Sequence, residues 1–184
     1  NAEVLDLCSG NGIIPLLLTE KTLARHITGL EIQESVAEMA GRSVKWNGLE
    51  ESIEIRCGDL KDAEEIFGRE TFDNITCNPP YKAPNAGLKN PDSVEMVARH
   101  EVACTLEDII AVSSKLLQTS GRLCMCHRPE RLAELISLMS KYKIEPKRLR
   151  LVCQRKGEEP WLILVEGKRC AKAGMRIDPV LYIE

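Results

Sequence analysis

Short apolar runs alternate along this chain with longer stretches of helical periodicity, and this alternation restricts the fold more than any other feature. Such a pattern is typical of a parallel sheet covered by helices on both faces. The predicted strands are Ala2–Leu7, Ile27–Ile32, Ile53–Cys57, Phe72–Cys77, Arg122–His127, Lys147–Gln154 and Trp161–Glu166. The predicted helices are Ile13–Leu23, Ser35–Trp46, Leu106–Leu117 and Glu130–Lys141, the last opened by Pro129. We therefore expect an α/β, doubly wound, Rossmann-like fold.

The last two predicted strands differ from the others because no helix-length segment separates them. The connection Arg155–Pro160 is charged and contains one glycine and one proline. A short connection of this kind favours a hairpin, so one strand should run antiparallel. We expect a mostly parallel, seven-stranded sheet that ends in an antiparallel C-terminal hairpin.

The length of 184 residues suits one domain, so we treat residues 1–184 as a single domain. The chain starts at Asn1 without a methionine and enters an apolar run at once, so we expect that an N-terminal segment is missing. No apolar run approaches the roughly 20 residues of a membrane span, which argues against a membrane protein. The sequence does not indicate an oligomeric state.

Eight cysteines lie mostly singly within apolar stretches, and no C-x-x-C motif is present. Cys124 and Cys126 are two residues apart on a predicted strand and therefore share a face, which suits packing better than a tetrahedral metal site. We expect no metal and free thiols in a reducing, cytoplasmic environment.

The charges are unevenly distributed along the chain. Residues 1–140 hold 14 Lys and Arg against 22 Asp and Glu, whereas residues 141–184 hold 11 against 6. A basic end on an acidic chain can bind phosphates, and the alternative is an ordinary solvated face.

Asp6 ends the first predicted strand, and a turn with two glycines follows it, D-L-C-S-G-N-G over residues 6–12. Glycines let a backbone approach a ligand closely, and the next helix offers free N–H groups at its start. The dinucleotide pattern G-x-G-x-x-G is absent. Asp6 would repel a phosphate but attract an ammonium group, which favours S-adenosylmethionine as the cofactor. The expected contact residues are Asp6, Cys8, Ser9, Gly10 and Gly12; a ligand-free tight turn is the alternative.

Acidic residues also end the second and third predicted strands. Glu31, followed by Ile32, is placed to accept bonds from both ribose hydroxyls of the cofactor. Asp59 is placed to meet its adenine amine, while Leu60 packs on the ring. Ligands of open α/β sheets bind at the carboxyl ends of the strands, so these acids support one another as a cofactor site.

The fourth predicted strand ends in N-P-P-Y, residues 78–81. Two prolines stiffen the backbone and leave carbonyl oxygens free. The lone pair of a planar amine is delocalised into the ring, which makes the nitrogen a poor nucleophile. If the Asn78 side-chain oxygen and the Pro79 carbonyl accept hydrogen bonds from the two amine hydrogens, electron density returns to the nitrogen and its lone pair is oriented. Tyr81 is expected to stack on the base, worth about 1–3 kcal/mol. We expect Asn78, Pro79, Pro80 and Tyr81 to carry catalysis, with Asn78 also touching the cofactor.

Taken together, D-L-C-S-G-N-G, G-L-E-I-Q, G-D-L and N-P-P-Y resemble the Rossmann-type methyltransferases that modify planar amines. Further stretches resemble one branch of them, the bacterial tRNA1(Val) (adenine-N6)-methyltransferases: A-R-H-E at 98–101, P-K-R-L-R at 146–150 and W-L-I-L-V-E-G at 161–167. The resemblance implies methylation of the exocyclic N6 amine of the adenine just 3′ of the anticodon of valine tRNA. Cys8 departs from the pattern, which usually has glycine there.

Several basic residues are weaker candidates for substrate binding. Lys82 and His100 lie in or next to the long connection after N-P-P-Y. Lys147, Arg148 and Arg150 alternate along a predicted strand, so Arg148 and Arg150 should share a face that Lys147 opposes. Such residues are expected to position RNA by its phosphates without reading its sequence.

Two other functions fit part of the pattern. A glutamine N5-methyltransferase acting on peptide release factors would share N-P-P-Y because an amide poses the same chemical problem. That group commonly has Ile after the Tyr, where this chain has Lys82, and the basic C-terminal part favours a nucleic acid. A non-catalytic RNA-binding module of the same fold is the second alternative, and the intact N-P-P-Y argues against it.

Overall fold

Nine strands form one sheet in the computed structural model, which describes residues 2–80 and 104–183. Their order is β3-β2-β1-β4-β5-β7-β6-β8, and β9 also pairs with β6. The strands are β1 (Ala2–Leu7), β2 (Ala24–Glu31), β3 (Ile53–Cys57), β4 (Phe72–Cys77), β5 (Leu117–His127), β6 (Ile144–Cys153), β7 (Leu162–Arg169), β8 (Arg176–Ile177) and β9 (Leu181–Tyr182).

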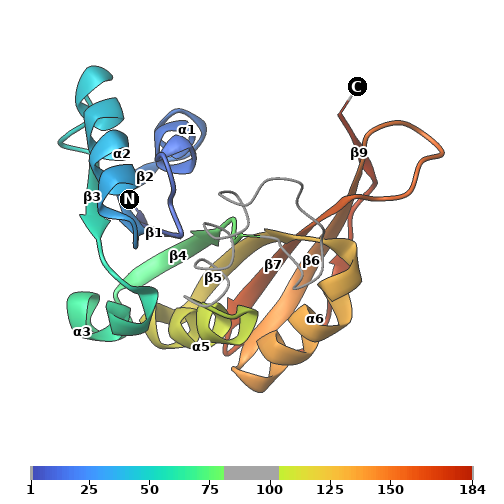
Figure 1. The fold of residues 1–184 in the computed structure, drawn as a ribbon. Coiled ribbons are helices and arrows are strands. Elements are labelled where there is room, and N and C mark those ends of the chain that lie inside the picture. Colours follow the sequence, from blue (N-terminus) through green and yellow to red (C-terminus); the bar gives the residue numbers. More distant parts are fainter. Residues whose placement is uncertain (1, 81–103, 184) are drawn as a thin grey trace, which may run out of the picture.

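Strand directions confirm the expected architecture. β3, β2, β1, β4 and β5 are parallel neighbours, and β7 runs antiparallel between β5 and β6 (Figure 1). All seven predicted strands are present. β8 and β9 extend the sheet along the outer edge of β6 and were not predicted, because two residues are too few to show a period-two pattern.

The helices lie in two layers (Figure 1). α1 (Ile13–Lys21) and α2 (Glu34–Trp46) pack on one face, where Val4 joins an apolar cluster with Val44. α3 (Ala63–Phe67), α5 (Leu106–Leu116) and α6 (Leu132–Lys141) pack on the other, around a larger cluster that includes Leu5 and Leu7. Adjacent residues of β1 thus enter opposite layers, as the doubly wound fold requires.

Local signals set some of the helix boundaries but not all of them. The Thr105 side chain caps α5 by accepting from the backbone of Asp108, which accepts in return from the Thr105 N–H. α5 ends one residue before the prediction, because Leu117 is already extended and opens β5. α6 begins later than predicted, because Pro129 opens a 3-10 turn, η2 (Pro129–Arg131), and not the helix itself.

The two faces of the sheet are covered unequally. α5 and α6 lie against β5 and β6 on one face (Figure 1). On the opposite face, no helix of the described residues lies over β7 and β6. Within the described ranges, none of the helices is long and apolar enough to span a membrane.

Candidate active site

The carboxyl ends of the parallel strands bring the predicted motifs together. Asp6 of β1 is paired in register with Gly29 of β2 and with Thr76 of β4. Residues that are far apart in the sequence therefore meet at one edge of the sheet. The shared edge is the position at which open α/β sheets bind ligands.

The turn after β1 is tightly packed against its neighbours. Cys8 adopts a left-handed conformation with φ of 57°, which is costly for a residue with a Cβ and natural for glycine. Gly12 has φ of 81°, and a Cβ there would lie 3.1 Å from that of Ala40. A Cβ at Gly29 would lie 2.6 Å from Ser9 Oγ, so the turn sits directly on β2.

Asp6 is fully buried beneath this turn. The Thr76 hydroxyl donates to its Oδ1 at 2.6 Å. Burial raises the pKa of Asp6 to about 7, because the charged form loses its hydration. Its Oδ2 and the nearby Ser9 Oγ are buried and make no hydrogen bond of good geometry among the described residues, and the Ser9 hydroxyl partly offsets the effect of burial on the pKa of Asp6. The Asp6 carboxyl and the Ser9 hydroxyl thus form a buried polar pair directly beneath the turn.

Glu31 ends β2 and is 5% exposed. Its Oε2 accepts from the backbone N–H of Gly10 at 2.9 Å, and its Oε1 accepts from that of Gln33 at 3.0 Å. The two bonds hold the carboxylate against the first turn and fix its orientation. Each oxygen keeps a second lone pair for a ligand hydroxyl.

A cavity lies between these strand ends. Its wall combines two acids with apolar side chains and is lined by Cys8, Leu30, Glu31, Ile32, Gly58, Asp59, Leu60, Pro80 and Cys104. Asp59 also caps the turn η1 (Leu60–Asp62) by accepting from the Lys61 N–H at 2.9 Å. The predicted cofactor residues Cys8, Glu31, Ile32, Asp59 and Leu60 thus line one cavity, while Asp6, Ser9, Gly10 and Gly12 form the layer beneath or beside it.

The N-P-P corner lies at the rim of the same cavity. Asn78 is exposed just beyond β4, Pro79 is buried, and Pro80 lines the cavity. The thiol of Cys126, from β5, donates to Asn78 Oδ1 at 3.1 Å. Tyr81 and two of the basic candidates, Lys82 and His100, lie outside the described residues.

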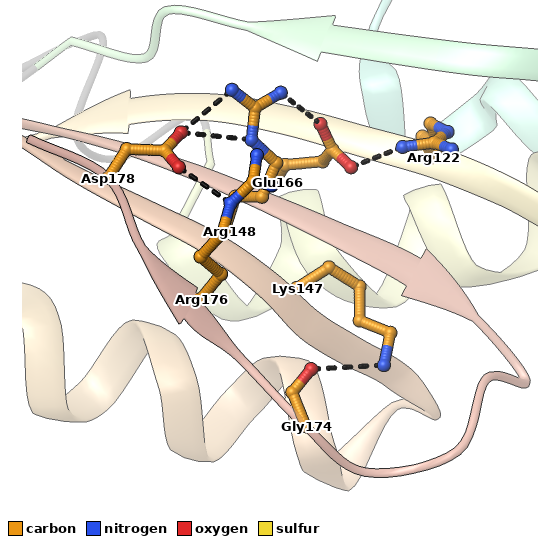
Figure 2. A network of polar contacts seen from close by, with 7 residues as sticks. All are labelled: Arg122, Lys147, Arg148, Glu166, Gly174, Arg176 and Asp178. Carbon is orange, nitrogen blue, oxygen red and sulfur yellow. Dashed lines mark hydrogen bonds and ion pairs between the residues drawn. The ribbon is translucent and has the colours of Figure 1, made fainter.

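The remaining basic candidates, Lys147, Arg148 and Arg150, lie on β6, and Figure 2 shows the first two of them. Arg148 and Arg150 share a face, as predicted, because both line one cavity of the sheet. Lys147 does not oppose them: a β-bulge between Pro146 and Arg148 makes it the extra residue, and it lines a surface groove together with Arg148. A bulge interrupts the alternation of side chains on which the prediction relied.

Three residues of the site were not singled out by the sequence. Thr76 and Cys126 were missed as partners of Asp6 and Asn78, because these contacts depend on the register between strands. Cys104 lies against Cys8 across the cavity, where a hydrogen bond to Cys8 and burial raise the pKa of the Cys104 thiol. Within residues 2–80 and 104–183, no cluster of three or more His, Cys, Asp or Glu side chains forms a potential metal site.

Comparison with protein families and with known proteins gives a consistent result. The family described as methyltransferase small domain matches residues 1–143. A tRNA1(Val) (adenine(37)-N6)-methyltransferase of Porphyromonas gingivalis is 33% identical over 166 residues, 89% of this chain and 64% of the relative. The enzyme of that name from Bacteroides fragilis is 27% identical, over 90% of this chain and 68% of the relative. The chain thus spans about two thirds of the length of such relatives.

Solved structures share the fold. A predicted O-methyltransferase from Agrobacterium tumefaciens superposes with a TM-score of 0.76 at 21% identity, covering 98% of this chain and 80% of the other. A geranyl diphosphate methyltransferase solved with S-adenosylmethionine gives 0.67 at 13% identity, covering 91% of this chain and 77% of the other. At this level of identity, the likeness establishes the Rossmann-like methyltransferase architecture.

Proposed function

Because the chain belongs to the methyltransferase small domain family, we propose that it methylates the exocyclic N6 amine of an adenine in tRNA, with S-adenosylmethionine as the methyl donor. The proposed target is the adenine beside the anticodon of valine tRNA, and the names of the P. gingivalis and B. fragilis relatives specify adenine 37 of tRNA1(Val). The proposed partner is therefore tRNA.

One observation carries this proposal: Pro80 of the N-P-P corner lines the same cavity as Glu31 and Asp59. A corner that grips a planar amine is useful only beside a methyl donor. The shared cavity supports that arrangement, because a ligand held by the strand ends would lie directly against the corner.

The residues around the cavity fit S-adenosylmethionine. The carboxyl of Asp6 and the hydroxyl of Ser9, which lie beneath the turn beside the cavity, suit the ammonium and carboxylate of its methionine part. Glu31, held by Gly10 and Gln33, suits the ribose hydroxyls. A dinucleotide would instead bring its phosphates against these acids, which repel them.

The proposed chemistry needs orientation more than a strong base. When bound, S-adenosylmethionine would supply a methyl group on a sulfonium sulfur; the nitrogen–carbon bond would form as the sulfur–carbon bond breaks, S-adenosylhomocysteine would leave, and the methylated nitrogen would lose its extra proton to solvent. Asn78 and the Pro79 carbonyl accept the two amine hydrogens and aim the nitrogen. Positioning of this kind contributes at most about 7–11 kcal/mol to catalysis. The base must leave its stack, which costs least in a single-stranded loop.

The assay that tests this function compares two substrates. The protein is incubated with labelled S-adenosylmethionine and either unmodified valine tRNA or a peptide release factor, and the tRNA nucleosides are analysed by mass spectrometry. We expect N6-methyladenosine in the tRNA and no label in the protein. Label in the release factor alone would establish the glutamine-amide alternative, and cofactor binding without transfer to either would leave a non-catalytic module.

A further inference from the structure

Among the described residues, no helix lies over β6 and β7 on the face of the sheet opposite α5 and α6. A cavity on this face is lined mainly by strand residues, among them Cys124 and Cys126 of β5, Leu164 of β7 and Arg148 and Arg150 of β6. Next to it is a second groove, which we call the basic groove. Its lining residues are Arg122, Lys147, Arg148, Glu166, Lys168, Gly174, Met175 and Arg176.

The strand register explains why these cations gather. Arg122 is paired with Lys168 across β5 and β7. One step further, Glu166 is paired with Arg148 across β7 and β6, and Arg148 with Arg176 across β6 and β8. Side chains of directly paired residues lie on the same face of a sheet. Four strands thus contribute charges to one surface.

Two carboxylates hold the arginines in fixed positions (Figure 2). Glu166 bridges Arg122 and Arg148, and Asp178 bridges Arg148 and Arg176, with Arg148 Nη2 and Arg176 Nε each 2.7 Å from an Asp178 oxygen. The Lys147 ammonium donates to the backbone carbonyls of Lys172 and Gly174. Side chains ordered in this way lose less entropy when a ligand binds.

The exposed charge of the surface is positive. The side chains of Glu166 and Asp178 are only 15% and 12% exposed, whereas those of Arg122, Arg148 and Arg176 are 49%, 48% and 68% exposed. Five cations therefore line the basic groove against two recessed carboxylates that each already bind two arginines. A groove of this composition attracts a polyanion.

β5 connects the basic groove to the N-P-P corner. Arg122 and Cys126 lie four residues apart on this strand and so point to the same face, about 13 Å apart at about 3.3 Å per residue. Cys126 contacts Asn78. A strand of nucleic acid whose target base reaches Asn78 can therefore lay its backbone in the groove within a few nucleotides of that base.

We propose that the basic groove binds the phosphates of the RNA strand that flanks the target adenine. The inference rests on the proposed function and adds the path of the substrate to it. Planar guanidinium groups suit phosphate oxygens, and the free edges of Arg122 and Arg176 face solvent. The groove holds the substrate in position without reading its sequence.

The test compares two pairs of charge-neutralising substitutions. Arg122→Gln with Lys168→Gln removes two cations of the groove, and Arg42→Gln with Lys45→Gln removes two exposed cations of α2 as a control with the same change in net charge. Binding of unmodified valine tRNA is measured by fluorescence anisotropy over a range of salt concentrations. Log affinity falls linearly with log salt concentration, and each lost phosphate contact should make this slope shallower by about 0.7–0.9. We therefore expect the slope to become shallower by about 1.4–1.8 in the groove pair and to change little in the α2 pair.

Further measurements separate the possible failures. Arg122→Lys keeps the charge and should keep the salt slope, and thermal unfolding checks that each variant is folded. Two results would refute RNA binding by the groove and leave the proposed function intact. One is an equal loss of affinity in both pairs, and the other is no loss of affinity in the groove pair while tRNA is still bound and methylated. Methylation of a release factor instead of tRNA would overturn the proposed function itself. Groove-dependent binding of an acidic peptide, with tRNA binding unchanged in the groove pair, would assign the groove to a protein partner.

Discussion

The Cys126 thiol donates a hydrogen bond to the Asn78 side-chain oxygen at 3.1 Å. This contact joins β5 to the end of β4 and selects the orientation of the Asn78 amide in which the oxygen faces Cys126. An amide oxygen has two lone pairs, and the thiol hydrogen bond is directed at one of them. Cys126 is thus a positioning residue for the group that we expect to orient the substrate.

Replacing Asn78 by alanine should abolish most methyl transfer. The side-chain oxygen acts on the incoming amine, so kcat should fall by about 10²–10³, the usual cost of removing one preorganised polar group. Cofactor affinity, measured by calorimetric titration, should stay within a few-fold of the wild-type value. Near-normal turnover in this variant would refute the assigned role.

Replacing Cys126 by valine should lower kcat by about three- to tenfold, because the donor to Asn78 is lost and a hydrogen bond is worth about 0.5–1.5 kcal/mol. Cys126→Ser keeps a donor and should restore most of the rate. The effect should disappear when Cys126→Val is made in the Asn78→Ala background, because the two residues act through one contact. Additive losses in the double variant would show that Cys126 acts only on packing.

Cofactor affinity should depend on pH through Asp6. Burial raises the pKa of Asp6 to about 7, so the carboxyl is largely neutral at pH 5 and attracts an ammonium group weakly. Affinity for S-adenosylmethionine should rise by up to about tenfold per pH unit towards pH 7 and then level off. Asp6→Asn should bind more weakly and with a flat profile in titrations from pH 5 to 8. A profile that stays steep in Asp6→Asn would assign the dependence to another group.

The same carboxyl should destabilise the ligand-free protein at high pH. Below about pH 3, Asp6 is protonated in both the folded and the unfolded states and has no effect. As the pH rises to about 7, only the unfolded state loses the proton, so the free energy of unfolding falls, by on the order of 4 kcal/mol in total. In urea denaturation, Asp6→Asn should be more stable than the wild type at pH 8 and equal to it at about pH 3. The exposed Asp62→Asn is the control and should show no such crossover.

Charge reversal at Arg148 should loosen the C-terminal segment. Arg148 is bound by both Glu166 and Asp178, so Arg148→Glu would place three carboxylates together and release β8 from β6. We expect a lower thermal midpoint, with a deficit that shrinks as salt screens the repulsion. Arg69→Glu, which removes one exposed ion pair with Glu64, should have a smaller effect. Equal midpoints for the two variants would mean that the network does not hold the segment.

Local patterns were sufficient for the main elements of the fold. β1, β3 and β4 begin and end at the predicted residues, because their apolar runs are bounded by turn residues that act locally. The start of α6 was misplaced because proline opens a 3-10 turn as readily as a helix. The side-chain direction of Lys147 was wrong because a bulge depends on the partner strand and leaves no signal in a single strand.

The sequence by itself determined the order of strands and helices, the acids at the strand ends and the N-P-P corner, since periodicity and turn chemistry act over a few residues. Only the tertiary structure decided which side chains meet. Asp6 and Thr76 are 70 residues apart, and Cys126 and Asn78 are 48 apart. The ion pairs that hold the arginines of the basic groove in place likewise join residues of separate strands. Contacts of this kind follow from the register between strands, which is set by the packing of the whole sheet.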